Sequence, residues 1–260
     1  MPESNFVFVD IGNSAIKFAT CESIDSATWS QSGSHFHEQL IDENTFSFLH
    51  EAASRNRQWF VCSVNSEACG QLLELLNNHR PDDLVTELDC DCYPFEISPD
   101  PASSIGVDRL MAAAGAVACY PKKNLVVVDA GTAVTIDAVD QDSRFLGGTI
   151  RAGLHLQRAA LHSYTSALPD LSRDERNLSE HIFGQDTAEA ILAGTGFGEL
   201  GAIMSIVQVM EDQFESEVQV VITGGGARWM KPYMPEEWTF TDDLVLKGVQ
   251  EVARHLDRVE

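Results

Sequence analysis

Residues 6–13 read FVFVDIGN, and residues 125–132 read LVVVDAGT. Each stretch has four apolar residues, then Asp, a small or apolar residue, Gly and a small polar residue. A second strand-like run follows each copy, at residues 14–19 and 133–139. Repetition within one chain is typical of duplicated structural units. The sequence therefore predicts two copies of one α/β unit that face each other.

Each copy has the pattern of a strand–turn–strand hairpin that can bind phosphate. The apolar run predicts a buried strand. Gly12 and Gly131 would allow a tight turn and a close approach of the backbone to a ligand. Asp10 and Asp129 end the strands, where a carboxylate can hold a cation directly or through water. An ordinary hairpin with a capping Asp would show this pattern once, whereas two matching copies favour phosphate binding.

A third glycine-rich turn follows the strand predicted at residues 218–222. Residues 223–227 read TGGGA. Three glycines after a strand let a flat ring or a phosphate lie against bare backbone. A flexible turn without a ligand is the alternative interpretation.

Composition excludes several classes of protein. The chain has 260 residues, of which 44% are apolar and 22% charged, so it can fold as one large domain or two smaller ones. Its net charge of −23 opposes nucleic-acid binding but not a small anionic ligand. The six scattered cysteines are typical of reduced thiols. With no signal-peptide pattern and only short apolar runs, we expect a cytoplasmic protein that binds neither nucleic acid nor membrane.

The expected elements describe two α/β halves, residues 1–119 and 120–260. Strands are expected near residues 5–10, 14–20, 59–64, 125–129, 133–139, 145–150 and 218–222. Helices are expected near residues 44–54, 66–79, 103–119, 153–165, 186–212 and 243–257. Strands at the start of each half, followed by helices, predict mixed sheets flanked by helices.

A candidate catalytic carboxylate lies at the start of the Ala-rich helix that begins near Gly106. Asp108 falls in its first turn, where the helix dipole favours acidic residues for structural reasons alone. Two observations favour a catalytic role: Arg109 beside it can clamp an anion, and the helix leads into the second hairpin. A carboxylate that accepts a hydroxyl proton beside groups that hold phosphates fits phosphoryl transfer.

Three other motifs are better explained by structure than by chemistry. Residues 196–201 read GFGELG, but a helical pattern precedes them where a dinucleotide fingerprint requires a strand. Close helix packing is therefore favoured. Residues 35–38, which read HFHE, lack metal-site spacing, and a loop is favoured over a metal site for Cys90 and Cys92 with His79.

Taken together, these motifs resemble those of the type III pantothenate kinases and, through them, the actin/hexokinase-like ATPase superfamily. Residues 10–17 (DIGNSAIK) resemble the motif DxGN(T/S)xxK, and residues 106–109 (GVDR) resemble GxDR. Residues 129–137 (DAGTAVTID), 147–153 (GGTIRAG) and 223–227 (TGGGA) resemble DAGTAxTxD, GGxIxPG and TGGDA. The five motifs occur in the family's order and span nearly the whole chain.

The chain departs from the family pattern at three places. Gly226 stands where the family has Asp, and Ala152 stands where it has Pro. A family tyrosine that lines the pantothenate pocket would fall near Pro99, and Tyr93 lies further upstream. These departures concern the pantothenate pocket more than the phosphate chemistry.

The resemblance implies a fold of duplicated ribonuclease H-like (actin-like ATPase) domains. It implies an enzyme that uses ATP to phosphorylate pantothenate to 4′-phosphopantothenate, the first step of coenzyme A biosynthesis. The cofactors would be Mg²⁺ with ATP and a monovalent cation, K⁺ or NH₄⁺, and the enzyme would be a homodimer. Two alternatives stay open: a non-catalytic nucleotide-binding accessory factor of the same family, and a sugar or acetate kinase of the superfamily. The intact set of Asp10, Asp108 and Asp129 favours an enzyme.

The resemblance also implies residue roles. ATP would be bound by Asp10, Ile11, Gly12, Asn13, Ser14, Ala15, Ile16, Lys17 and Thr132. Pantothenate would be bound by Gly106, Val107, Asp108, Arg109 and Thr187. Asp108 would be the catalytic proton acceptor, Asp129 would ligate the monovalent cation, and Asp10 would also lie near Mg²⁺.

Overall fold

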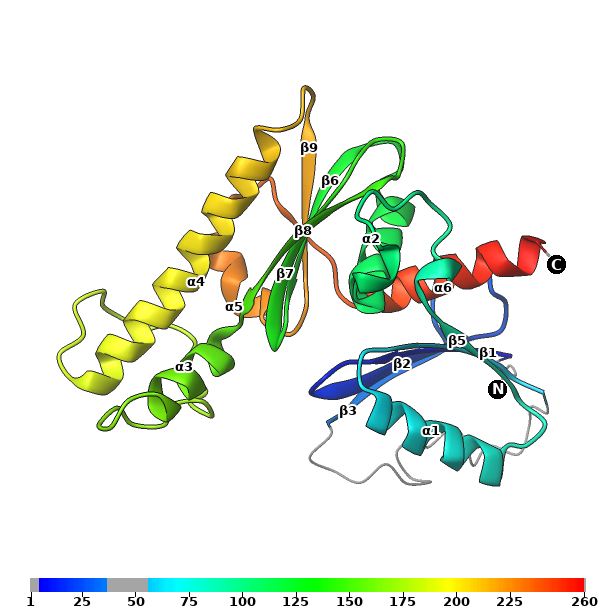
Figure 1. The fold of residues 1–260 in the computed structure, drawn as a ribbon, viewed down its shortest axis with the longest axis horizontal. Coiled ribbons are helices and arrows are strands. Elements are labelled where there is room, and N and C mark those ends of the chain that lie inside the picture. The colour runs from blue at the N-terminus through cyan, green and yellow to red at the C-terminus, as the bar shows by residue number, and fades with distance from the viewer. Residues whose placement is uncertain (1–4, 37–55, 260) are drawn as a thin grey trace. The chain divides into compact units, whose positions relative to one another are not determined.

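The computed structural model describes residues 5–36 and 56–259. The chain divides into two compact units: unit 1 contains Met1–Cys119 with Leu244–Glu260, and unit 2 contains Tyr120–Asp243. The helix predicted near residues 44–54 lies outside the described residues. Figure 1 labels the elements of both units.

Unit 1 is built on a five-stranded mixed sheet. The strand order is β3-β2-β1-β4-β5, in which β1, β2 and β3 are antiparallel neighbours and β4 and β5 run parallel to β1. Their bounds are β1 (Phe6–Ile11), β2 (Ala15–Cys21), β3 (Gln31–Phe36), β4 (Gln58–Ser63) and β5 (Leu84–Leu88). The apolar residues of β1 and β4 are buried, as the sequence pattern predicts for central strands.

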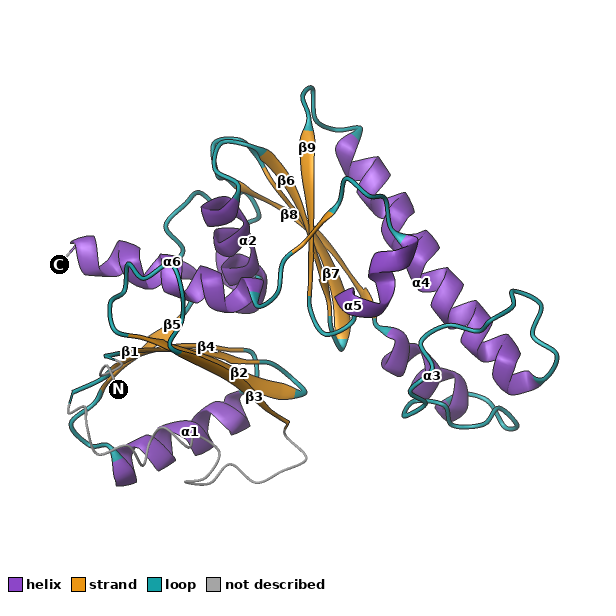
Figure 2. Ribbon diagram, turned by 180° about the vertical axis from the view of Figure 1, so that it is seen from behind, coloured by secondary structure: helices purple, strands orange, loops and turns teal. Residues whose placement is uncertain are grey.

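Helices cover both faces of the unit 1 sheet (Figures 1 and 2). Helix α1 (Ser66–His79) is capped by the side chain of Asn65 and packs Leu72 and Leu76 onto one face. Helices α2 (Val107–Cys119) and α6 (Leu244–Val259) cover the other face. Short 3-10 turns at Cys90–Cys92 and Ala102–Ser104 lead from β5 to α2.

The C-terminal helix corrects the predicted division into residues 1–119 and 120–260. Leu244–Glu260 belong to unit 1, because α6 packs on α2 through two glycines. A Cβ atom added to Gly115 would overlap the backbone of Leu244, and one added to Gly248 would overlap the backbone of Met111. The two helix backbones thus touch at a distance that only glycine permits.

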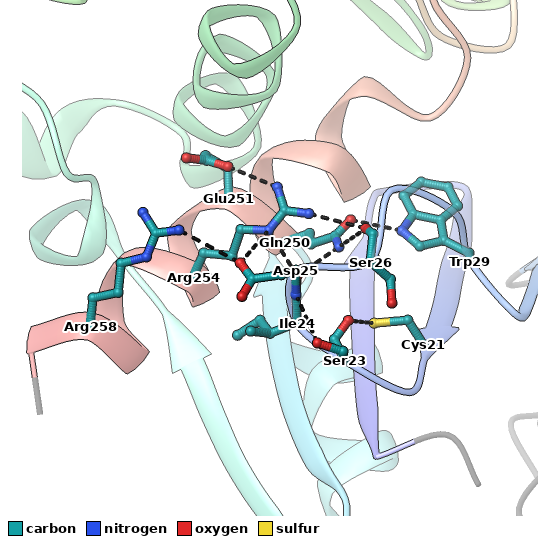
Figure 3. A network of polar contacts seen from close by, with 10 residues as sticks. All are labelled: Cys21, Ser23, Ile24, Asp25, Ser26, Trp29, Gln250, Glu251, Arg254 and Arg258. Atoms are coloured by element: carbon teal, nitrogen blue, oxygen red, sulfur yellow. Dashed lines mark hydrogen bonds and ion pairs between the residues drawn. The ribbon is translucent and has the colours of Figure 1, made fainter. Parts of the chain in front are cut away.

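Polar contacts attach α6 to the loop that joins β2 and β3 (Figure 3). The Gln250 side chain donates to the carbonyls of Ile24 and Ser26, both at 2.9 Å, and accepts from Trp29 Nε1 at 2.9 Å. Arg254 donates to the same two carbonyls. Because Gln250 is buried, replacing it with an apolar residue would remove these three hydrogen bonds and leave Arg254 as the donor to the two carbonyls.

Unit 2 repeats the topology of unit 1. Its strand order is β10-β9-β6-β7-β8, in which β6, β7 and β8 are antiparallel neighbours and β9 and β10 run parallel to β6. The strand bounds are β6 (Asn124–Ala130), β7 (Ala133–Val139), β8 (Phe145–Ala152), β9 (Val218–Thr223) and β10 (Thr239–Phe240). The helices are α3 (Leu154–Ser163), α4 (Thr187–Glu211) and α5 (Ala227–Met230), followed by a 3-10 turn at Lys231–Tyr233.

Helix α4 is long and apolar enough, by length and composition, to cross a membrane. In unit 2 its residues Leu200, Ile203 and Val207 are buried against β6, β7 and β9 in one hydrophobic cluster. Half of its most apolar 18-residue window is buried. This packing is that of a core helix.

The predicted α/β class, with two mixed sheets flanked by helices, is confirmed. The duplication predicted from residues 6–13 and 125–132 extends to whole sheets, because each repeat forms the central strand of one sheet. The sequence did not predict β3, β5 or β10, which lie at or next to the sheet edges.

Candidate functional site

The first hairpin joins β1 to β2 through residues 12–14. Gly12 N donates to Ala15 O at 3.0 Å, and Asn13 and Ser14 are exposed at the tip. Ile11 and Ile16 are fully buried, so they can offer a ligand only their backbone. The tip therefore presents polar side chains and backbone amides, the groups that bind phosphate oxygens.

The strand register brings three functional groups together at this hairpin. Asp10 is the Cα partner of Lys17 in β2 and of Cys62 in β4. Paired residues point their side chains to the same face of a sheet. A carboxylate and a lysine thus stand side by side next to the turn.

The candidate base Asp108 lies in the first turn of α2, as predicted. Its Oδ1 accepts a hydrogen bond from Arg109 N at 2.8 Å. Burial raises the pKa of Asp108 above its ordinary value, and the hydrogen bond and charge of Arg109 offset this only in part. A raised pKa makes a carboxylate a stronger base, which suits proton acceptance.

Cys62 connects the hairpin with the helix. Its thiol is fully buried in β4, and burial together with the negative charges of Asp10 and Asp108 raises its pKa well above the ordinary value. Both carboxylates therefore lie within electrostatic reach of one thiol. Asp10 and Asp108 thus belong to the same part of unit 1.

The second hairpin joins β6 to β7 through residues 131 and 132. Gly131 N donates to Ala133 O at 3.0 Å, and Thr132 is half-buried. Asp129 is the Cα partner of Thr135 in β7 and of Thr223 in β9. The carboxylate is thus flanked by two threonines, so this end of the sheet is rich in oxygen ligands.

The glycine-rich turn after β9 packs closely on the second hairpin. Gly224 has φ +91°, and an added Cβ would lie 2.5 Å from Ala130 O and overlap the Asp129 carboxylate. Gly226 N donates to Ala130 O at 2.8 Å, and an added Cβ there would lie 3.1 Å from the same oxygen. Glycine relieves this tight contact at a position where the family motif has Asp.

Other predicted residues stand on other elements. Thr187 is the first residue of α4, follows the long connection after α3, and is exposed. Tyr93 is buried and packs edge-on against Phe95, with ring centroids 5.5 Å apart, as a core residue would. Among the described residues no group of three or more His, Cys, Asp or Glu side chains could hold a metal ion.

The glycine motif at residues 196–201 lies within α4, as the helical interpretation predicted. Gly196 packs against Asn177 and Leu178, whereas Gly198 and Gly201 face open space. Sequence reasoning missed Cys62 and Glu199, which are buried beside the hairpin of unit 1 and in unit 2, respectively. A glutamate inside an apolar helical stripe was the only available signal for Glu199.

The family model described as type III pantothenate kinase matches residues 6–209. That stretch is more than half of the chain and contains both hairpins and residues 106–109. The chain belongs to the type III pantothenate kinase family.

Individual type III pantothenate kinases agree with this membership. The chain is 35% identical to one from Flavobacterium johnsoniae over 64% of this chain and 66% of the relative. It is 36% identical to one from Porphyromonas gingivalis over 58% of this chain and 62% of the relative. These two matches span less than two thirds of the relatives' length. A third, from Hydrogenovibrio crunogenus, is 30% identical over 96% of this chain and 99% of the relative.

Solved structures agree in fold. A protein from Campylobacter jejuni described as a conserved putative Baf family transcriptional activator has a TM-score of 0.60 and 21% identity, over 97% of this chain and 99% of that one. A putative 2-dehydro-3-deoxygalactonokinase from Sinorhizobium meliloti has a TM-score of 0.53 and 12% identity, over 96% and 99%. At these identities the likeness supports the duplicated fold alone.

Proposed function

We propose that this member of the type III pantothenate kinase family transfers the γ-phosphoryl group of ATP to pantothenate and forms 4′-phosphopantothenate. This is the first step of coenzyme A biosynthesis. The observation that carries the proposal is that Asp10 and Asp108 both lie within electrostatic reach of Cys62 in unit 1. It combines a carboxylate at a phosphate hairpin with a partly buried carboxylate of raised pKa that can serve as base.

In the proposed mechanism, Asp108 accepts the proton of the pantothenate hydroxyl as the oxygen attacks phosphorus. Arg109, together with Gly106 and Val107, orients pantothenate, and Thr187 contributes a further contact. Residues 10–17 and Thr132 bind the phosphates of ATP through backbone amides, hydroxyls and Lys17. Positioning and electrostatic stabilisation supply most of the rate enhancement in phosphoryl transfer.

The residues fit the two implied cations. Mg²⁺ prefers carboxylate and phosphate oxygens, and Asp10 next to the first hairpin would lie near it. A monovalent cation, K⁺ or NH₄⁺, would be held by Asp129, whose register partners Thr135 and Thr223 supply further oxygen atoms. Bound cations would offset the negative charge of the phosphates.

A homodimer is supported by the apolar surface of unit 2. Ile150 of β8 is 63% exposed and Phe183, just before α4, is 79% exposed. On α4, Gly194, Gly198 and Gly201 are exposed and face open space. Small residues on one helix face allow a second backbone to approach closely, and exposed apolar side chains mark interfaces. We infer that a second copy of the chain covers this surface.

A cytoplasmic location is supported by the cysteines. All six are free thiols, and the pKa of buried Cys21 is raised to about 11 by burial. Unpaired cysteines in this number are typical of a reducing compartment.

Release of ADP tests the proposed function. The purified chain is incubated with Mg²⁺ and ATP, with or without pantothenate, in K⁺ or in Na⁺. We expect turnover that requires pantothenate and is faster in K⁺. Turnover that ignores pantothenate would favour another kinase of the superfamily, and binding of ATP without turnover would favour a non-catalytic accessory factor.

A further inference from the structure

The turn between β8 and α3 supports the second hairpin directly. Gly153 N donates to Thr132 O at 3.0 Å. A Cβ atom at Gly153 would lie 2.5 Å from Gly131 O and 2.7 Å from Thr132 O, closer than real Cβ contacts. The position of the hairpin backbone therefore depends on where this turn is held.

A buried carboxylate on α4, that of Glu199, contacts one residue before the turn and one residue after it. Glu199 has a side-chain exposure of 1% and forms an ion pair with Arg151, the residue before Ala152 at the end of β8. Its Oε2 also accepts from Gln157 Nε2 at 2.8 Å. Gln157 in turn donates from Nε2 to Ala152 O at 2.9 Å and from its backbone N to Gly153 O at 3.0 Å.

The attachment of α3 to α4 also has hydrogen bonds that do not involve this carboxylate, although the charge of Glu199 acts on Arg158. Arg158, which is fully buried, donates to Thr195 of α4 and to the carbonyls of Asp174 and Asn177 in the connection between the helices. Helix α3 and its following connection are thus tied to α4 by a separate set of contacts.

Burying a carboxylate in order to join two elements costs free energy. Burial raises the pKa of Glu199, and the charge of Arg151 and the Gln157 hydrogen bond counter it only in part. Apolar residues of similar volume often stabilise a fold as well as or better than a buried ion pair. What apolar residues cannot supply is a fixed direction for the Arg151 and Gln157 side chains.

We propose that Glu199 is a positioning residue for the second phosphate hairpin. Through Arg151 and Gln157 it holds the turn at Gly153, and the turn holds Thr132 in the orientation that binds ATP. The inference rests on the proposed function only in assigning ATP to Thr132.

Two variants test this inference in the full-length chain. Gln157→Leu removes the hydrogen bonds to Glu199 and Ala152 without changing any charge. Glu199→Gln removes the charge and keeps the shape. Each should raise the KM for ATP by about tenfold, the factor expected for one or two lost hydrogen bonds, with the KM for pantothenate within about twofold. As the matched control, Arg176→Met breaks an exposed ion pair with Asp174 in the same unit and should leave both constants unchanged.

A double variant separates positioning from stability. Arg151→Met combined with Glu199→Leu replaces the ion pair with apolar side chains and should keep a wild-type melting temperature. A merely structural role predicts a wild-type KM for ATP in this variant, whereas positioning predicts the same rise as in Gln157→Leu. A folded Gln157→Leu chain with wild-type KM for ATP would overturn the inference.

Calorimetric titration with ATP keeps the two proposals distinguishable. If the wild-type chain binds ATP but shows no pantothenate-dependent turnover, the proposed function fails. The positioning inference then still predicts about tenfold weaker ATP binding by Gln157→Leu than by Arg176→Met. Equal affinities of these two variants would overturn it.

Discussion

The two hairpins begin from similar sequences and differ in what surrounds them. In unit 1 three residues separate β1 from β2, and Asp10 at the strand end has Lys17 and Cys62 as its register partners. In unit 2 two residues separate β6 from β7, and Asp129 at the strand end has Thr135 and Thr223 as its register partners. One hairpin thus carries a cationic side chain where the other carries hydroxyls.

Packing separates the hairpins further. An added Cβ at Gly12 would meet only Ala15 O, at the ordinary distance of 3.5 Å. The second hairpin is enclosed by glycine turns, because added Cβ atoms at Gly153 and Gly224 would overlap its backbone. The two hairpins thus share a strand–turn–strand backbone and differ in what packs around it: Lys17 stands beside the first, and two glycine turns press on the second.

The largest expected effect concerns Asp108, the candidate base in the same unit as the first hairpin. We expect Asp108→Asn to lower kcat by about a thousandfold, the middle of the range for a lost general base, and to leave ATP binding within about twofold. Single-turnover phosphorylation of pantothenate and calorimetric titration with ATP measure the two quantities. A variant with wild-type kcat would reject Asp108 as the base.

The pH profile sharpens the same assignment. Burial raises the pKa of Asp108, and only its deprotonated form can accept a proton. Wild-type kcat should therefore fall as the pH drops through a value above the ordinary range of aspartate. The residual activity of Asp108→Asn should lack this acid limb. An identical acid limb in the variant would assign the titration to another group.

The next effect tests the difference in packing. Gly224→Ala places a Cβ at positive φ against the Asp129 carboxylate, so it should lower the free energy of unfolding by about 3 kcal/mol. Gly12→Ala should lower it by less than about 1 kcal/mol, since its Cβ meets no close neighbour. Urea denaturation compares the two. Equal losses of unfolding free energy in the two variants would contradict the difference in packing between the two hairpins.

A smaller effect tests the difference in charge. Lys17→Met removes the cation of the first hairpin and should raise the KM for ATP about thirtyfold, because a charge-assisted hydrogen bond to phosphate is lost. Thr135→Val removes the hydroxyl at the corresponding position of the second hairpin. It should raise the KM for ATP by no more than about fivefold. Steady-state kinetics with varied ATP would contradict the comparison if Thr135→Val had the larger effect.

The smallest effect concerns the cations. Asp129→Asn removes one ligand charge and should raise the K⁺ concentration needed for half-activation by about tenfold, with little change in the Mg²⁺ requirement. Asp10→Asn should raise the Mg²⁺ concentration needed for half-activation, with little change in the K⁺ requirement. Titration of activity with each salt distinguishes them. A shared response of both variants to K⁺ would contradict separate ion sites.

The buried central strands could be predicted from the sequence. The edge strands and the packing partner of the C-terminal helix could not. Continuous apolar runs identify the buried strands at residues 6–9 and 125–128. Strand β3 reads QSGSHF and has a single apolar residue, the exposed Phe36, which is too little to signal a strand. The apolar face of α6 is clear from the sequence, but its partner is decided by the contact of Gly115 with Gly248, far apart in the chain.

The candidate site was predictable where one motif supplies it. Asp10 and Asp108 follow from motifs, whereas their common neighbour Cys62 depends on the parallel pairing of β1 with β4. Glu199 could not be given a role, because its partners Arg151 and Gln157 come from other elements. Contacts between elements are set by tertiary packing, which local patterns do not encode.

Calorimetric titration with ATP and with AMP tests most directly whether each hairpin binds the phosphates of a nucleotide. The measurement compares the wild-type chain with Lys17→Met from the first hairpin and Thr132→Val from the second. We predict that each variant binds ATP more weakly than the wild type while AMP binding stays within about twofold, since AMP lacks the β- and γ-phosphates. A variant of either hairpin that binds ATP with wild-type affinity would contradict the account.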